Sequence, residues 1–479
     1  MLSLPPLFTD FYQLTMAYGY WKLNRCEQQA VFHLVFRNAP CQGNYAVACG
    51  LEAVVAFLKQ WRFMPDDITY LASLRYESGE VIFPEDFLNY LASLRFSCDL
   101  SAIPEGTIVF PHEPLLRIQG PLLQCQLLES ALLNIINFQT LIATKASRIC
   151  MAAHGDPVIE FGMRRAQGPD GALSASRAAY IGGCVAVSNT MAGQYYKLPV
   201  RGTHAHSWVS AFPSEKEAFE AYASVLPHNC ILLVDTYDTI QGVKHAIEIG
   251  RVLRQQGADL LGIRLDSGDM VELSIKARTM LDAAGFNQTH IVASNTLDEY
   301  AIADLKKRGA KISMWGVGTH LVTSYDYPAL DGVYKLSAIQ DQAGCWQPTI
   351  KLSEEELKIS NPGRHQVRRF FYGDQYAGDV IYDIDLGMDD VPEIVTQNGV
   401  LHPIKMDDYD AYADLLQPIF KQGKYVMVEE SIHLMRKRAL EEAARFYRTY
   451  QSESYRVGLE KKCDALKKSL VKKLVSEKQ

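Results

Sequence analysis

The sequence predicts an α/β protein whose central part is a parallel β-sheet closed into a (β/α) barrel, with at least one further domain. Three observations predict it. The chain has 479 residues, more than a single hydrophobic core ordinarily serves. Between about residues 121 and 337, short apolar runs alternate with helical stretches. Each apolar run leads directly into polar or glycine-rich residues, as barrel strands do where they end.

The elements of this central part follow from hydrophobic periodicity. Apolar runs of strand length predict strands at 157–161, 230–235, 261–266, 290–294 and 312–316. Amphipathic stretches between them predict helices at 215–226, 241–256, 270–284 and 297–308. Apolar strands that alternate with helices belong to parallel sheets, and this many units in series favour closure into a barrel.

The flanking segments mix helices and strands. Residues 9–23 predict an opening helix, and residues 31–37 predict an alternating strand. The sequence Tyr-Leu-Ala-Ser-Leu-Arg occurs at 70–75 and again at 90–95, each time after proline and two acids, which suits two scaffold helices. The expected domain parts are 1–120, 121–337 and 338–479.

The last part of the chain is polar and ends in a basic segment. Leu459, Leu466, Leu470 and Leu474 fall on one helical face among lysines, which predicts an amphipathic helix. A membrane or partner role is one interpretation of this helix. Packing on the protein's own surface is the favoured one.

Composition narrows the class of function. Hydrophobic residues make up 48% of the chain and charged residues 22%, a globular profile. The formal charge of −7 argues against nucleic-acid binding, which needs a cationic surface. The cysteines form no CxxC motif, as is typical of reduced cytosolic thiols. Because no leader pattern and no stretch of membrane-spanning length is apparent, we expect a cytoplasmic protein without a membrane partner.

Charged and small residues follow the predicted strands, and a barrel would bring them to one face. Asp235 and Asp238 follow one strand, in a segment that superficially resembles the ribose-phosphate loop of another phosphoribosyltransferase class. The alternative is that these acids cap the next helix. Arg264 and Asp266 alternate on another strand and so point to the same side, either as a salt bridge or, as we favour, in a ligand site. The segment 316–319 is rich in glycine, which lets backbone N–H groups approach a phosphate.

The segment Gly-Thr-His-Ala-His-Ser at 202–207 is the least routine. His204 and His206, one residue apart, could hold a metal ion, although no third ligand stands at a familiar spacing. A neutral imidazole is also a nucleophile toward phosphoryl groups. A plain polar loop is the third alternative for His204.

Taken together, these motifs resemble those of nicotinate phosphoribosyltransferases, a type II phosphoribosyltransferase family. The resemblance spans most of the chain, and its long run from Phe161 to Gly183 is highly specific. The matching stretches are 9–16, 161–170 (FGMRRAQGPD), 176–183 (SRAAYIGG), 202–206, 235–238, 264–269, 316–319 and 351–364. Their order along the chain argues against coincidence.

The resemblance implies a reaction and a fold. Nicotinate would condense with 5-phosphoribosyl 1-pyrophosphate to give nicotinate mononucleotide and pyrophosphate, in NAD salvage. The family uses Mg²⁺, and it hydrolyses ATP as a co-substrate through a phosphohistidine, a ligase-type coupling. The implied fold is an irregular (β/α) barrel joined to a second α/β domain built from the N- and C-terminal parts of the chain. A homodimer with shared active sites is expected.

The same resemblance assigns roles to single residues. His206 matches the phosphohistidine, Phe161 should stack on the pyridine ring, and Tyr12 should cover its other face from a neighbouring subunit. Arg264 should contact the nicotinate carboxylate, and Arg164 should lie near the ring and ribose.

Further roles concern charge and phosphate. Ser188 and Asn189 stand where a nicotinamide-using relative carries an aspartate, and a neutral residue there suits a carboxylate substrate. Asp235 and Asp266 are implied for the ribose hydroxyls and the magnesium shell. The remaining implied contacts are with the 5-phosphate, by Ser294, Gly316, Gly318 and Thr319, and with pyrophosphate or ATP phosphates, by Arg37, Lys351 and Arg364.

Departures from the family pattern and alternative functions complete the expectations. Residues 39–45 are less glycine-rich than the family pattern, and Arg364 stands where lysine is commoner. One alternative is a relative acting on nicotinamide or quinolinate. Another is an inactive nucleotide-binding barrel that regulates a partner, against which intact Arg264, Asp266 and His206 argue.

Overall fold

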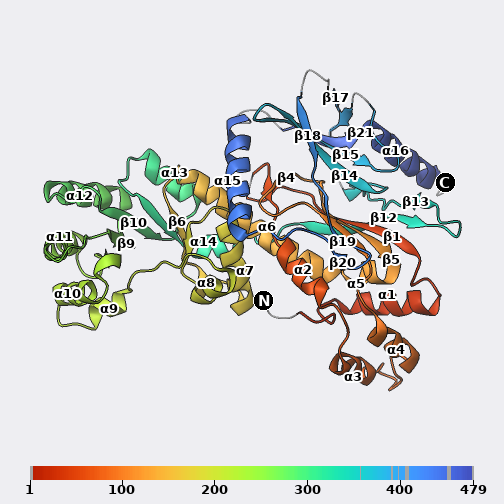
Figure 1. Cartoon of the computed structure of the whole chain (residues 1–479), viewed down its shortest axis with the longest axis horizontal. Helices are drawn as coiled ribbons and strands as arrows, with labels where there is room; N and C mark the ends of the chain where they lie inside the picture. The colour runs from red at the N-terminus through yellow and green to blue at the C-terminus, as the bar shows by residue number, and fades with distance from the viewer. Residues whose placement is uncertain are drawn as a thin grey trace. The chain divides into compact units, whose positions relative to one another are not determined.

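The computed structural model describes residues 4–41, 43–355, 358–389, 392–396, 399–404, 409–449 and 455–476. The chain, coloured by residue number in Figure 1, divides into two compact units. Unit 1 comprises Met1–Leu141 with Ala329–Gln479, and unit 2 comprises Ile142–Pro328. Unit 2 is therefore shorter at both ends than the predicted central segment, residues 121–337.

Unit 2 contains the parallel sheet that the sequence predicts. Its strands are β6 (Val158–Glu160), β7 (Ala186–Val187), β8 (Ile231–Leu233), β9 (Gly262–Leu265), β10 (His290–Asn295) and β11 (Met314–Val317). The order across the sheet is β7-β6-β11-β10-β9-β8, and every neighbouring pair is parallel. The α/β class is thereby confirmed, and β7, which has two residues, was not among the expected strands.

The order of neighbours in unit 2 is that of a barrel with one open seam. β6 lies between β7 and β11, so the last strand of unit 2 pairs with the first strand of unit 2. Val187 also forms a parallel bridge with Val200, which extends the series beyond β7. Among the described residues, no backbone ladder joins the segment at Val200 to β8. The irregularity of the barrel is concentrated at this seam.

Helices connect the strands of unit 2, and Figure 1 shows α11 and α12 beside β9 and β10. The helices are α7 (Gly168–Ile181), α8 (Thr190–Tyr196), α9 (His206–Ser210), α10 (Glu215–Val225), α11 (Thr239–Gln255), α12 (Met270–Ala283), α13 (Glu299–Lys307) and α14 (Thr319–Val322). Asp238, Asp269 and Asp298 cap α11, α12 and α13, because their side chains accept hydrogen bonds from first-turn N–H groups. These caps fix the loops that follow the strands.

Unit 1 is built around a seven-stranded sheet of order β13-β12-β1-β5-β3-β19-β20. Its strands are β1 (Gln29–Phe36), β3 (Asp99–Ala102), β5 (Pro114–Pro121), β12 (Gly332–Gln340), β13 (Trp346–Pro348), β19 (Gln417–Lys421) and β20 (Lys424–Tyr425). β1 pairs antiparallel with β12 on one side and with β5 on the other (Figure 1). Strands from both parts of the chain thus share one sheet.

A second sheet of unit 1 has the order β17-β16-β21-β15-β14-β18. Its strands are β14 (His365–Tyr372), β15 (Gln375–Asp383), β16 (Glu393–Val395), β17 (Leu401–Pro403), β18 (Ala411–Asp414) and β21 (Val457–Glu460). Phe370, Val380, Ile394 and Ile404 form its buried apolar cluster. A separate antiparallel pair consists of β2 (Ala46–Val47) and β4 (Ile108–Val109).

The helices of unit 1 include the two predicted from the repeated hexapeptide, α3 and α4. They are α1 (Phe11–Lys22), α2 (Leu51–Lys59), α3 (Pro65–Ser73), α4 (Glu85–Ser93), α5 (Leu122–Leu127), α15 (Ile432–Thr449) and α16 (Lys461–Ser476), and α6 (Glu129–Ala152) runs across the division. α16 contains Leu466, Leu470 and Leu474 of the predicted amphipathic helix, and it packs on β16 and β21. The prediction was wrong for Leu459, which lies on β21, because the helix begins only at Lys461. Of the described helices, none combines the length and the apolar content that crossing a membrane requires.

Candidate functional site

A cavity of about 470 Å³ lies at the carboxyl ends of the parallel strands of unit 2. The predicted site residues that line it are Phe161, Arg164, Ser188, Arg264, Asp266, Ser294, Gly316, Gly318 and Thr319. The other lining residues are Met163, Arg165, Gly202, Thr203, His204, Ala205, Asn295 and Thr296. Loops that are far apart in the sequence therefore meet at one face, as the barrel interpretation expected.

Phe161 follows β6 directly, and its ring packs on Gly316 of β11. A side chain at position 316 would place its Cβ 2.5 Å from the Phe161 ring, so only glycine leaves room for the ring there. The fully buried Glu160 accepts hydrogen bonds from the Gly162 N–H and, at 2.8 Å, from Ser176 Oγ. Burial raises the pKa of the Glu160 carboxyl. These contacts fix the backbone on both sides of the ring.

Arg264 lies on β9 and offers hydrogen-bond donors to the cavity. Its Nη1 donates to Thr203 Oγ1, and no described residue accepts a hydrogen bond from its buried Nε. Burial lowers the pKa of Arg264, and the carboxylates of Asp266 and Asp235 oppose that shift. Among the described ion pairs, Asp266 faces His206 and not Arg264. The guanidinium therefore keeps donor capacity for an anionic ligand.

Asp235 and Asp266 form a linked pair of carboxylates after β8 and β9. Asp235 Oδ2 accepts hydrogen bonds from the Asp266 N–H at 2.8 Å and from Ser267 Oγ at 2.7 Å. Asp266 Oδ1 accepts from Ser294 Oγ. Asp235 Oδ1 is buried and receives no hydrogen bond from the described residues. Since carboxylate oxygens are the ligands that Mg²⁺ prefers, this pair fits a magnesium site.

The two acids of the 235–238 segment therefore have different roles. Asp238 accepts a hydrogen bond from the Gln241 N–H at 2.7 Å and so caps α11. Asp235 binds the loop of the neighbouring strand instead. The capping alternative is confirmed for Asp238, and a ligand contact of Asp235 stays a prediction.

His206 begins α9 beside this acid pair. Its Nδ1 lies 3.1 Å from Thr236 Oγ1, and its Nε2 lies 3.8 Å from Asp266 Oδ2. The side chain is 45% exposed, so a phosphoryl donor in solution has access to the ring. His206 does not line the cavity itself, but Asp266, which faces His206, does line it.

His204 has the surroundings of a structural residue and not those of a metal ligand. Its Nε2 accepts a hydrogen bond from the Leu233 N–H at 3.2 Å, and its Nδ1 lies 3.4 Å from the Ala205 carbonyl oxygen. Burial lowers the pKa of His204 to about 4. Because the backbone engages both ring nitrogens, neither is left for a metal ion.

The loops after β10 and β11 carry the predicted phosphate-binding residues. Ser294, Gly316, Gly318 and Thr319 line the cavity together. Asn295, which was not predicted, lies between them with φ at 126°, a conformation that side chains rarely adopt. Such strain is commonly kept at functional loops.

An unpredicted pair of residues outside the cavity lining, Asp298 and His320, joins these two loops. Asp298 caps α13 by accepting a hydrogen bond from the Ala301 N–H, and it also accepts one from His320 Nδ1 of α14 at 2.9 Å. The His320 ring stacks on Tyr325 at 4.5 Å between centroids. The pair therefore holds the loop after β10 to the loop after β11.

Ser188 and Asn189 separate in the structure. Ser188 follows β7 and lines the cavity, where it presents a neutral hydroxyl. Asn189 is 1% exposed and caps α8, with its Oδ1 accepting from the Ala192 N–H at 3.1 Å. A contact between Asn189 and a substrate stays a prediction.

The four predicted residues of unit 1 have different surroundings. Tyr12 is half exposed on α1. Lys351 is exposed, and its N–H donates to Ser360 Oγ. Arg364 forms an ion pair with Asp385, with its Nε donating at 2.7 Å. Arg37 follows β1 and lines a cavity of unit 1.

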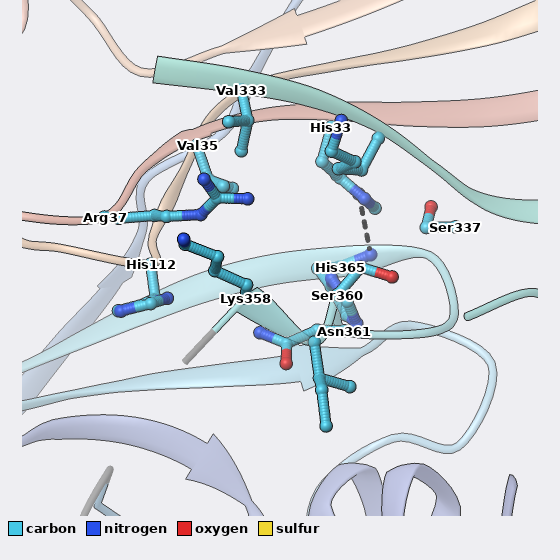
Figure 2. Close-up of a pocket in the computed structure, with 12 residues that line it drawn as sticks. His33, Val35, Arg37, His112, Val333, Ser337, Lys358, Ser360, Asn361 and His365 are labelled. Carbon is cyan, nitrogen blue, oxygen red and sulfur yellow. Dashed lines mark hydrogen bonds between the residues drawn. The ribbon is translucent and has the colours of Figure 1, made fainter. Parts of the chain in front are cut away.

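That cavity of unit 1, about 40 Å³, is rich in basic residues (Figure 2). Figure 2 shows the cationic ends of Arg37 and Lys358 facing the same space, with His112 beside them. Lys335 also lines it, and burial lowers its pKa, an effect to which Arg37 adds. Burial lowers the pKa of His112 to about 4. No described acid lines this cavity, which suits an anion such as a phosphate.

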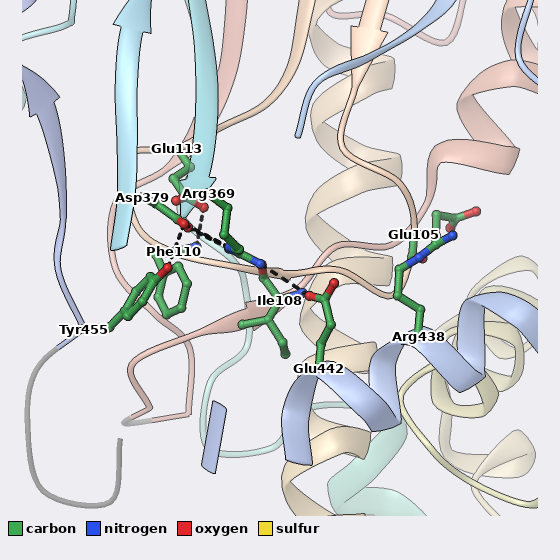
Figure 3. Close-up of polar contacts among 9 residues, drawn as sticks. All are labelled: Glu105, Ile108, Phe110, Glu113, Arg369, Asp379, Arg438, Glu442 and Tyr455. Atoms are coloured by element: carbon green, nitrogen blue, oxygen red, sulfur yellow. Dashed lines mark hydrogen bonds and ion pairs between the residues drawn. The ribbon is translucent and has the colours of Figure 1, made fainter. Parts of the chain in front are cut away.

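A buried polar network in unit 1 contains none of the predicted site residues (Figure 3). Arg369 of β14 pairs with Asp379 of β15 at 2.6 Å and with Glu442 of α15 at 3.4 Å. Tyr455 donates to Asp379 at 2.7 Å. Burial, to which Asp379 adds, raises the pKa of the fully buried Glu113 well above its usual range. The network fastens α15 and the segment before β21 to the second sheet.

Sequence reasoning missed several lining residues. Arg165 and Thr203 adjoin predicted residues, and this adjacency was the available signal. Lys335 and Lys358 lie in segments whose local pattern gives no sign of a cavity. The grouping of Lys335 with Arg37 depends on the pairing of β1 with β12.

Comparisons with known proteins show the family to which the chain belongs. Residues 7–137 match the family described as the nicotinate phosphoribosyltransferase N-terminal domain. The nicotinate phosphoribosyltransferase of Bacillus subtilis is 44% identical over 421 residues, which cover 87% of this chain and 84% of that protein.

Solved structures extend the similarity to the fold. The crystal structure of human nicotinic acid phosphoribosyltransferase matches with a TM-score of 0.83 at 30% identity, covering 96% of this chain and 99% of that chain. The nicotinate-nucleotide pyrophosphorylase from Pyrococcus furiosus shares the fold, with a TM-score of 0.68 at 22% identity, over 92% of this chain and 95% of that chain. The chain described here belongs to the nicotinate phosphoribosyltransferase family.

Proposed function

We propose that this protein transfers the 5-phosphoribosyl group of phosphoribosyl pyrophosphate to the ring nitrogen of nicotinate. The products are nicotinate mononucleotide and pyrophosphate, in the cytoplasmic salvage of NAD. ATP hydrolysis drives the synthesis through phosphorylated His206. Family membership supports the reaction class, and the cavity of unit 2 supports the choice of substrate.

The observation that carries the proposal is the buried guanidinium of Arg264 beside the Phe161 ring. Both residues line the cavity, and Arg264 Nε has no acceptor among the described residues. A flat anion satisfies both features, because its ring stacks on Phe161 while its carboxylate pairs with Arg264. Ser188, a neutral residue in the same lining, leaves the carboxylate without a repelling charge.

The reaction needs placement and charge stabilisation more than proton transfer. The bond from C1 to pyrophosphate breaks as the pyridine nitrogen attacks, and this nitrogen carries no proton at neutral pH. Phe161 and Arg264 orient the ring, while Ser294, Thr319 and the glycine N–H groups hold the 5-phosphate. No side chain is required as a general base.

Asp235 and Asp266 would hold Mg²⁺ and the ribose hydroxyls. The unpaired oxygen Asp235 Oδ1 fits this role. When bound, the ion supplies positive charge against the departing pyrophosphate. Ser267 keeps the Asp235 carboxylate in place through its hydroxyl group, whereas the hydroxyl of Ser294 would turn from Asp266 to the phosphate when substrate binds.

His206 is the proposed site of phosphorylation. The γ-phosphoryl group moves from ATP to the imidazole, which releases ADP, and water later cleaves the phosphohistidine to phosphate. Thr236 orients the ring, and Asp266 connects it to the cavity. Phosphorylation thereby changes the charge next to the residues proposed for magnesium.

The basic cavity of unit 1 is proposed for pyrophosphate or ATP phosphates. Arg37 was predicted for this role, and Lys335 and Lys358 line the same cavity. Contacts of Lys351 and Arg364 with the same phosphates stay predictions. We propose a homodimer with shared active sites, in which Tyr12 of one subunit covers the nicotinate ring bound to the other.

The test is product detection with phosphoribosyl pyrophosphate and Mg²⁺, with and without ATP. Nicotinate, nicotinamide and quinolinate are supplied separately. We expect nicotinate mononucleotide with nicotinate, with more product when ATP is present. Preference for either other substrate would refute the assignment of Arg264 and Ser188. Calorimetric binding without turnover of any substrate would instead support the inactive regulatory barrel.

A further inference from the structure

The open seam of the barrel in unit 2 lies next to the proposed phosphohistidine. Val187 bridges to Val200 on one side of the seam, and β8 forms the other side through its pairing with β9. The segment from Gly202 to Ala205 lies between Val200 and α9 in the chain, and it contacts β8 through His204. Backbone N–H groups at such a gap need acceptors from outside a ladder.

The side chain of His204 provides one of them. Its Nε2 accepts the hydrogen bond of the Leu233 N–H, the last residue of β8, at 3.2 Å. The residue is 7% exposed, and its ring packs edge-on against Tyr222 of α10 at 4.8 Å between centroids. An imidazole nitrogen thus occupies the place where a neighbouring strand would offer a carbonyl oxygen.

This contact requires a neutral ring. Burial holds the pKa of His204 at about 4, and the nearby charges of Arg264 and His206 act in the same direction, while the Ala205 carbonyl opposes them. Near neutral pH, Nδ1 carries the ring proton toward that carbonyl, and Nε2 keeps its lone pair for Leu233.

The residues on both sides of His204 serve the proposed reaction. Thr203 accepts a hydrogen bond from Arg264 on β9, and His206 contacts Thr236, which follows β8. The loop is therefore attached to two adjacent strands, and His204 is its attachment to β8. Loss of the hydrogen bond between His204 and Leu233 would detach the 202–205 loop from β8.

We propose that His204 is a positioning residue, which closes the barrel seam through its imidazole and so presents His206 to the phosphoryl donor and to Asp266. The proposal rests on the proposed function of His206.

The test compares two substitutions of His204. His204→Gln keeps an acceptor near the position of Nε2, whereas His204→Leu fills the space without one. His228→Leu is the matched control, because this histidine is exposed in the turn before β8. The rate of amide hydrogen exchange in a peptide covering β8 measures how well the seam is closed. The ratio of ATP hydrolysed to nicotinate mononucleotide formed measures the coupling of ATP hydrolysis to synthesis.

We expect exchange at Leu233 to become about tenfold faster in His204→Leu, since its amide loses its acceptor. The rate of ATP-coupled synthesis should fall roughly 10- to 100-fold, as misplacement of a reacting group does. The ratio of ATP hydrolysed to product should also change, which mere loss of stability would not cause. His204→Gln should restore all three quantities, and His228→Leu should leave them unchanged.

Two results would overturn the proposal. Unchanged exchange at Leu233 in His204→Leu would show that the imidazole does not close the seam. Faster exchange with unchanged synthesis and coupling would show that the seam does not position His206. The exchange measurement needs no activity, so a failure of the proposed function, seen as a wild-type protein that hydrolyses no ATP, is recognised separately.

Discussion

The contact between Gly316 and the Phe161 ring gives a sharp prediction for Gly316→Ala. A Cβ at this position would lie 2.5 Å and 2.6 Å from two ring carbons, whereas ordinary carbon contacts are about 3.5–4.0 Å. An overlap of roughly 1 Å must be relieved by movement of the ring or of the strands. Overpacking of this kind costs about 1–3 kcal/mol.

How the overlap is relieved decides which measurement changes. If the ring rotates away, the KM for nicotinate rises roughly 5- to 150-fold, because about 1.4 kcal/mol corresponds to a factor of ten. If the ring stays, the free energy of unfolding falls by the same about 1–3 kcal/mol. Steady-state kinetics at saturating phosphoribosyl pyrophosphate and ATP, together with chemical denaturation, separate the two outcomes.

A double-mutant cycle identifies the ring as the cause. In a Phe161→Ala background, the Cβ added by Gly316→Ala no longer overlaps an aromatic ring. Its effects on the KM for nicotinate and on the free energy of unfolding should therefore largely disappear. Gly171→Ala on α7 is the control, because no atom lies within 4 Å of its added Cβ, and it should leave the KM unchanged. Unchanged KM and unchanged stability in Gly316→Ala would refute the packing of Phe161 on Gly316.

Four further predictions test the site and the fold. His206→Ala should abolish ATP hydrolysis, measured as phosphate release, and leave slow uncoupled transfer; unchanged hydrolysis would exclude His206 from that role. Arg264→Ala should raise the KM for nicotinate roughly 10- to 150-fold, because a hydrogen bond to a charged group contributes about 1.5–3 kcal/mol, and wild-type kinetics would contradict the contact. Asp298→Asn should keep the cap on α13 but weaken the hydrogen bond to His320. The KM for phosphoribosyl pyrophosphate should therefore rise severalfold, while the KM for nicotinate stays constant. Equal changes in both KM values would argue against a link between the phosphate loops. Burial raises the folded pKa of Glu113, so this residue contributes stability that is full below its ordinary pKa of 4.5 and is lost as the pH rises toward the folded pKa. Glu113→Gln should therefore lose less stability than the wild type as the pH is raised above 4.5 in denaturation experiments. Parallel losses of stability would contradict a buried proton on Glu113.

The central strands could be predicted because their signal is local. The expected strand at 261–266 corresponds to β9, and the expected helix at 241–256 corresponds to α11. The residues at strand ends, such as Arg264 and Ser294, could also be placed, because a parallel sheet brings its carboxyl ends together.

What could not be predicted depends on contacts between distant segments. β7 has two residues, too few for any periodicity. The ion pair of Arg364 with Asp385 depends on the folding of the second sheet, and sequence offers no sign of it. Lys335 joins Arg37 because β12 pairs with β1, about 300 residues away along the chain.

The pairing of β1 with β12 has a consequence for biosynthesis. Ribosomes add about 5–20 residues per second, so β1 emerges roughly 15–60 s before its partner. During that interval the contiguous unit 2 is completed, while β1 has β5 on one side and an exposed edge on the other. The nascent chain must protect this edge from other chains until β12 arrives, which makes the final pairing a late and aggregation-sensitive step of maturation.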